Sequence, residues 1–184
     1  MLWLLFACTA SSFDTANLGG QSGSESAMGC EAGSFVVITD SDESSELDPL
    51  IDAAAGDWSG ALERSGGTSE ALSATFTPDS LALQRFEPSE DECSPYYSVE
   101  TVIALESDGA LRESRSGALR LYDDGRTSLV LEIPVDEIQG DLTDPTGTAT
   151  SLRITAERSA DTWQGVLLWE GATMNEEGTF TLER

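Results

Sequence analysis

The chain has no lysine and no histidine, so its nine basic side chains are all arginine. The absence of histidine excludes a serine–histidine–aspartate relay and imidazole metal ligands. The absence of lysine excludes a phosphate-loop lysine and Schiff-base chemistry. Against these absences stand 34 carboxylates and a formal charge of −25 over 184 residues. Such a charge repels phosphate groups, so the sequence predicts no nucleic-acid partner.

The acidic side chains are spread unevenly along the chain. Residues 1–63 hold 11 acidic side chains and no basic one, whereas residues 64–184 hold 23 acidic side chains and all nine arginines. The length fits one domain plus a tail, since domains run from about 50 to 250 residues. Charge of this kind supports solubility, and a salt-rich habitat or a GC-rich genome would also favour it.

The chain opens with an apolar run, Met1–Ala7, that is followed by Cys8 and a polar segment. A membrane-spanning helix needs about 20 apolar residues, so this run predicts the end of an export signal. Its Leu5-Phe6-Ala7-Cys8 resembles the lipobox of bacterial lipoproteins, which implies cleavage before Cys8 and a lipid on Cys8. Phe6 is larger than the usual residue at its position. The basic segment of such signals is absent, which predicts an upstream start codon or a shortened sequence.

Residues 9–34 are rich in serine, glycine and alanine, which is typical of a flexible tether. We therefore expect a signal-peptide remnant at 1–7, a lipidated tether at 8–33 and a single domain at 34–184. Thr9 is not the aspartate that lipoproteins associate with inner-membrane retention, so the resemblance implies an outer-membrane anchor. The alternative is a chance apolar start on a cytosolic protein.

The three cysteines agree with export. If Cys8 carries lipid, Cys30 and Cys93 remain as a pair for a disulfide. Their bridge would close a 63-residue loop. In the chain-entropy model this stabilises the fold by up to about 4 kcal/mol. The alternative is two unpaired thiols. Neither has a basic neighbour in the sequence, which argues against a catalytic thiol.

From residue 34 onward, apolar residues alternate with polar ones, which predicts β-strands. The longest inward row is Tyr97 to Leu105, and Asp-Gly pairs at 108–109 and 124–125 predict hairpin turns. Closing a meander of long strands removes exposed edges, so we expect an all-β fold, a small antiparallel up-and-down β-barrel, with a β-sandwich as the alternative. The expected segments are 34–39, 58–62, 72–76 followed by 81–83, 97–106, 110–122 with a bulge at Gly117, 129–133, 148–157, 162–170 and 178–183.

One short helix interrupts the strands. Asp48 suits an N-cap, Pro49 the first helical turn and Gly56 the C-terminal stop. Only about two turns of 3.6 residues fit between them, so we expect a connector helix.

Gly56-Asp57-Trp58 resembles the Gly-x-Trp that opens the first strand of lipocalin-like (calycin) barrels. The resemblance implies that Trp58 plugs the closed end of the barrel and that Arg184 packs on it. Trp58 and Trp163 share the pattern Trp-x-Gly-small-Leu. Residues 143–145 lack the tyrosine of the second lipocalin motif. The alternative is that both tryptophans are core residues of an unrelated barrel.

Five carboxylates in nine residues form the best candidate for a metal site. Calcium prefers six to eight oxygen ligands and tolerates irregular loops, so a calcium ion is the one cofactor worth considering. The spacing lacks the glycine and the terminal glutamate of an EF-hand, and the alternative is a solvated acidic loop. The five residues are Asp40, Asp42, Glu43, Glu46 and Asp48.

No serine stands in a Gly-x-Ser-x-Gly elbow, and some of 34 acidic residues will form carboxylate pairs by chance, so we expect no enzyme. The sequence predicts an exported, lipid-anchored cell-envelope protein whose β-barrel is a non-catalytic binding or structural module. Its expected partners are the membrane, through the lipid, and another protein. The alternative is a calycin-like carrier that holds a small apolar ligand near four aromatic residues, Trp58, Tyr97, Trp163 and Trp169.

Overall fold

A computed structural model describes residues 33–39, 41–89 and 94–184, and for residues 41–43 it describes the backbone alone. The described residues form one helix, one short 3-10 turn and nine strands. In chain order these are β1 (Gly33–Val37), α1 (Ser41–Ala54), β2 (Gly56–Arg64), β3 (Ser69–Pro88), β4 (Tyr96–Ser107), β5 (Arg112–Tyr122), β6 (Thr127–Pro134), η1 (Val135–Glu137), β7 (Ala149–Ser159), β8 (Thr162–Gly171) and β9 (Asn175–Glu183).

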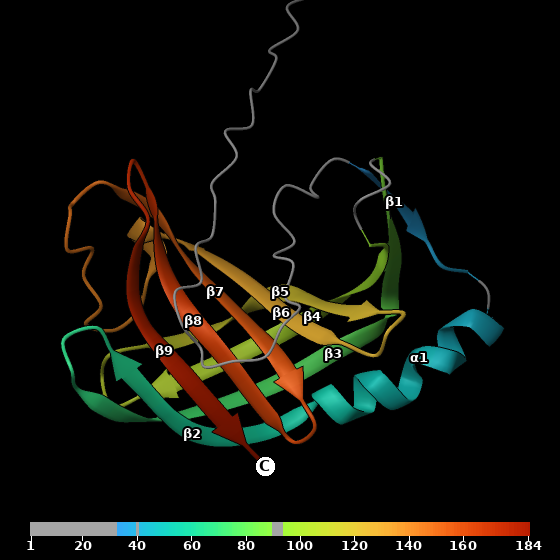
Figure 1. The fold of residues 1–184 in the computed structure, drawn as a ribbon, viewed down its shortest axis with the longest axis horizontal. Coiled ribbons are helices and arrows are strands. Elements are labelled where there is room, and N and C mark those ends of the chain that lie inside the picture. Colours follow the sequence, from blue (N-terminus) through green and yellow to red (C-terminus); the bar gives the residue numbers. More distant parts are fainter. Residues whose placement is uncertain (1–32, 40, 90–93) are drawn as a thin grey trace, which may run out of the picture.

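Strands β2 to β9 form a closed, antiparallel, up-and-down barrel (Figure 1). Each strand pairs with the next along the chain, and β9 returns to pair with β2. The barrel expected from the sequence is therefore confirmed, and the sandwich alternative is not. Closure leaves no open edge within the ring of eight strands.

Strand β1 lies outside the ring, and among the described strands it pairs with the second half of β3 alone, where Phe35 is opposite Phe86. The 20-residue β3 joins the two parts, because its first half pairs with β2 and its second half with β1. The sequence placed a break after Phe76, but the structure has one strand with a register shift between Pro78 and Leu83. The shift absorbs the proline, which donates no hydrogen bond to the sheet.

The barrel interior is filled by alternating side chains. In β4, Val99, Thr101, Ile103 and Leu105 are buried, as the alternation predicted. Apolar side chains from all eight barrel strands belong to a single core, together with Ile51 and Ala54 of α1. An interior of eight strands is just wide enough for side chains to fill.

Both expected Asp-Gly turns are present. Gly109 has φ 88° and Gly125 has φ 84°, the left-handed conformation that such turns require. The bulge expected at Gly117 is wrong, because the β4–β5 register runs through it without a shift. Gly117 has a different role: a Cβ there would lie 2.7 Å from the carbonyl oxygen of Val130.

Helix α1 begins earlier than the sequence indicated. The N-cap expected at Asp48 is wrong, since the helix spans Ser41–Ala54 and contains Pro49. The acidic segment before Asp48 is therefore helical and not a loop. Acidic residues in the first turns interact favourably with the helix dipole, and Ile51 and Ala54, which are 6% and 0% exposed, bury the opposite end against the barrel.

Candidate functional site

Trp58 and Arg184 close the end of the barrel next to α1. Trp58 is 2% exposed, and its Nε1 donates to the carbonyl oxygen of Ala54 at 3.1 Å. The guanidinium carbon of Arg184 lies 4.8 Å from the centre of the Trp58 ring. The same guanidinium donates to the carbonyl oxygens of Asp52 (3.3 Å) and Ala55. The expected contact between Arg184 and Trp58 is present, and it joins the last strand to the C-terminus of α1. Membership of the lipocalin-like barrels stays a prediction.

Two of the four aromatic residues predicted to bind a ligand meet in this layer. Trp163 is fully buried and packs edge-on against Trp58, with ring centres 6.2 Å apart, and against Phe76, at 5.4 Å. Tyr97 lies on another strand beneath the guanidinium of Arg85, at 5.5 Å. Such contacts are those of a packed core, which favours a structural role for the two tryptophans.

Trp169, the fourth residue, lies apart from Trp58 and Trp163. It is six residues further along β8 than Trp163, and strands rise about 3.3 Å per residue. Its Nε1 donates to Oε2 of Glu177 at 3.1 Å. The structure therefore does not gather the four residues around one apolar space.

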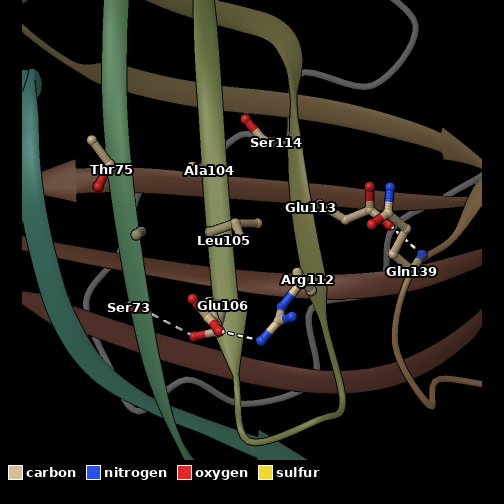
Figure 2. Close-up of a pocket in the computed structure, with 10 residues that line it drawn as sticks. Ser73, Thr75, Ala104, Leu105, Glu106, Arg112, Glu113, Ser114 and Gln139 are labelled. Atoms are coloured by element: carbon tan, nitrogen blue, oxygen red, sulfur yellow. Dashed lines mark hydrogen bonds and ion pairs between the residues drawn. The ribbon is translucent and has the colours of Figure 1, made fainter.

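Two hollows among the described residues lie away from this layer. Both open to solvent beside the β4–β5 hairpin, across strands β2 to β5, and they measure about 320 Å³ and about 580 Å³. In Figure 2, Ser73 and Thr75 project from β3, and Glu106 and Arg112 reach toward each other from β4 and β5. A filled interior with outer hollows favours a packed barrel over an apolar carrier.

The smaller hollow offers little chemistry. Arg112 pairs with Glu106 at 2.7 Å, and the hydroxyl of Ser73 donates to the carbonyl oxygen of Glu106 at 3.3 Å. The Thr75 hydroxyl donates to Asp57 at 2.7 Å. These groups already bind one another, and no described lining residue pairs a nucleophile with a base.

At the opposite end of the barrel, the loop end, an ion-pair network surrounds Arg64. Its Nε lies 2.9 Å from Glu177 Oε1, and its Nη1 lies 3.4 Å from Glu70. Partial burial acts to lower the pKa of Arg64, but the two glutamates outweigh it and raise the pKa above its ordinary value. Ser107 donates to the other oxygen of Glu70 at 3.3 Å. The buried charges of this network therefore have close partners.

A second network at the loop end fills a gap between β5 and β6, which pair only near Ala118–Leu121. The buried Glu113 accepts from Arg115 Nε (2.8 Å) and from the backbone amide of Gln139 (2.6 Å). Arg115 also donates to the Glu137 carboxylate at 2.6 Å. The hydrogen bond to Glu113 is the main cause of the raised pKa of Arg115. These contacts attach the segment after β6 to β5.

A third polar group lies inside the α1 end. Thr127 Oγ1, Arg158 Nε and Trp163 Nε1 are buried and have no hydrogen-bond partner. The register places Thr127 opposite Arg158, and Arg158 opposite Trp163. The sequence named only Trp163. Thr127 and Arg158 carry no motif, and only the pairing of β6, β7 and β8 brings them together.

The other predicted site residues give no structural test. Cys8, Cys30, Cys93 and Asp40 lie outside the described residues, and the side chains of Asp42 and Glu43 are not described. Glu46 and Asp48 are exposed on α1. No group of three or more metal-binding side chains gathers in the described ranges, and no helix there is long and apolar enough to span a membrane. Lipidation, the disulfide and calcium binding stay predictions.

The fold and this geometry define a closed eight-stranded barrel that is plugged by tryptophan and arginine at one end and tied by ion pairs at the other. No protein-family model, no curated protein and no solved structure matches the chain.

Proposed function

We propose that the chain is a cell-envelope lipoprotein, anchored through Cys8, whose barrel is a non-catalytic binding module. The Leu5-Phe6-Ala7-Cys8 run supports the anchor. The described fold begins at Gly33, well after Cys8, so a lipid on Cys8 would be separated from the barrel by the serine- and glycine-rich segment. This arrangement suits a domain held near a membrane.

The observation that carries the binding role is the edge strand β1. Within the described ranges it pairs with β3 on one side only, and all five of its residues are exposed. Phe35, Val36 and Val37 are 53%, 46% and 62% exposed. An apolar edge strand can accept a further strand from another chain, because main-chain hydrogen bonds supply affinity and side chains supply specificity.

The partner that fits β1 is an extended segment of another envelope protein. Residues 33–39 carry no charge, whereas the whole chain carries −25. A second copy would bring the same negative charge and is opposed by repulsion. A neutral or basic segment meets no such barrier.

The anchor is tested by detergent-phase partitioning and intact mass after expression of the full chain in a bacterium that processes lipoproteins. Wild-type protein is expected in the membrane fraction, with a mass that fits cleavage before Cys8 and added acyl chains. Cys8→Ser is expected in the soluble fraction, and Cys30→Ser, the matched control, is expected to behave as wild type. A wild type that partitions like Cys8→Ser contradicts the anchor.

The binding role is tested by a photo-crosslinking amino acid placed at Val36 and, as a control, at the equally exposed Val102 on the barrel wall. We expect one discrete adduct with a different polypeptide at Val36 and none at Val102. Adducts at both positions, or at neither, contradict binding through β1. An adduct with twice the mass of the chain identifies a second copy and contradicts the charge argument.

A further inference from the structure

The three unpartnered atoms at the α1 end belong to side chains that follow one another across the adjacent strands β6, β7 and β8. Thr127, Arg158 and Trp163 occupy inward positions of three adjacent strands, in phase with the buried residues of those strands. Directly opposite residues of antiparallel strands have Cβ atoms about 4.5–5.5 Å apart. Thr127 and Trp163 are 2% and 0% exposed, so bulk water does not satisfy them.

The charge of Arg158 is poorly balanced. Its side chain is 13% exposed, and its one ion pair among the described residues is with Asp161 at 3.9 Å, a side chain that is 84% exposed. Its guanidinium carbon lies 5.9 Å from the Trp58 ring, which Arg184 also contacts. A largely buried cation is costly without a close counter-charge. Arg158 therefore has no close counter-charge among the described residues, although the protein as a whole is strongly acidic.

We propose that Thr127, Arg158 and Trp163 bind one small monovalent anion. This anion is either a halide ion or a molecule that presents a carboxylate group. The Nε–H of arginine and the Nε1–H of tryptophan can only donate, whereas the threonine hydroxyl can donate or accept. The two N–H groups lack an acceptor, the hydroxyl can donate to the same acceptor, and hydrogen bonds to a charged acceptor are the stronger ones. A bound anion would satisfy the three atoms and balance Arg158 at once.

The same strand provides a matched control. Arg153 lies on β7, and its Nε is also buried without a partner. It occupies the opposite face of the strand, between the buried Leu152 and Ile154, and its Nη1 pairs with Glu170 at 3.3 Å. Arg153 therefore has a carboxylate partner and does not share the interior face with Thr127, Arg158 and Trp163. Its substitution is not expected to change the response of the protein to anions.

The test compares thermal unfolding of the full chain in sodium chloride, sodium acetate and sodium methanesulfonate at equal concentration. Equal sodium and ionic strength hold the screening of the surface carboxylates constant, and methanesulfonate is the bulky reference anion. We expect chloride or acetate to raise the Tm of the wild type by about 3 °C or more over methanesulfonate. Chloride alone would identify a free halide, and acetate would identify a carboxylate as the acceptor.

Three variants test whether this effect arises at Thr127, Arg158 and Trp163. Arg158→Gln is expected to lose the Tm difference between anions, and Thr127→Val, which keeps the side-chain shape, to weaken anion affinity by about tenfold, the loss expected for one hydrogen bond to a charged group. Arg153→Gln is expected to keep the wild-type difference. If Arg158→Gln does not fold, Thr127→Val decides. Equal Tm values of the wild type in all three salts, an anion effect that survives in Arg158→Gln, or an anion affinity of Thr127→Val equal to that of the wild type, would overturn the proposal.

Discussion

The two ends of the barrel differ in how their arginine side chains are paired. At the loop end, Arg64 and Arg115 lie between carboxylates at 2.6–3.4 Å, and the buried Glu113 and Glu177 have partners. At the α1 end, Arg184 caps backbone carbonyls, while the one ion pair of Arg158 among the described residues is with a distant and exposed aspartate. The networks around Arg64 and Arg115 therefore have their partners among the described residues, whereas Thr127, Arg158 and Trp163 at the α1 end have polar atoms without one.

This difference indicates where a ligand is expected. Buried polar groups are satisfied in folded proteins, so a complete network indicates a structural role and an incomplete one indicates a missing partner. Variants at Trp58, Glu177, Arg184 and Asp144 separate the two ends, in decreasing order of the expected change in stability.

Trp58→Ala is expected to destabilise the fold by about 3–5 kcal/mol, because it opens a cavity in the core and removes the surface on which Arg184 and Trp163 pack. Urea unfolding measures the loss. Trp58→Phe keeps an aromatic ring and is expected to lose less. A loss under about 1 kcal/mol for the alanine variant would mean that Trp58 does not close the barrel.

Glu177→Gln is expected to cost about 3 kcal/mol, because it removes the charge partner of Arg64 and disturbs the acceptor of Trp169 Nε1. The neighbouring Glu176 is exposed, and Glu176→Gln is expected to change the free energy of unfolding by less than about 0.5 kcal/mol. Similar values for the two variants would show that the loop-end network contributes no stability.

Arg184→Ala is expected to cost about 1–2 kcal/mol, since it removes a cation–π contact and a cap on two carbonyl groups. Arg184→Lys keeps the charge over Trp58 and is expected to lie between wild type and the alanine variant. If the alanine variant unfolds at the wild-type urea concentration, the link between β9 and α1 is not part of the closure.

Asp144, in the loop before β7, provides a pH-dependent test. Desolvation acts to raise its pKa, but hydrogen bonds from the Ala149 amide (2.7 Å) and from the amide (2.9 Å) and hydroxyl (2.8 Å) of Thr146 outweigh it and lower the pKa. Because the pKa of Asp144 is lower in the folded state, the ionised carboxylate stabilises the fold at pH values above the ordinary pKa of about 4. This stabilisation is lost as the pH falls through the folded pKa.

The Tm difference between wild type and Asp144→Asn is therefore expected to be small at neutral pH and to vanish in acid. Thermal unfolding from pH 7 downward measures it, and an NMR titration of the Asp144 carboxylate reads the pKa itself. A pKa at or above the ordinary value would contradict the hydrogen-bonded loop.

Much of the fold follows from local pattern. Alternation predicted the inward row from Tyr97 to Leu105, and the two Asp-Gly pairs predicted the turns, in which Gly109 and Gly125 have positive φ. The start of α1 could not be read locally, because contacts of Ile51 and Ala54 with the barrel stabilise a helix through an acidic run and a proline. Tertiary packing overrides propensity in such segments.

The candidate site was less predictable than the fold. The resemblance of Gly56-Asp57-Trp58 to lipocalin-like barrels implied the plug and its arginine, and the pairing of β2 with β9 places Arg184 over Trp58. Thr127 and Arg158 were not identified from the sequence. An inward arginine differs from a surface arginine only in which face of its strand it occupies. The phase of β7 becomes meaningful once the register with β6 and β8 is known.

The most direct test of the incomplete α1 end is X-ray diffraction from crystals of the full chain grown in sodium bromide, with anomalous data collected at the bromine edge. The account predicts an anomalous peak within hydrogen-bond distance, about 3.2–3.5 Å for a halide, of Thr127 Oγ1, Arg158 Nε and Trp163 Nε1. Density of a water molecule without an anomalous signal, or three side chains that bond to one another, would contradict it.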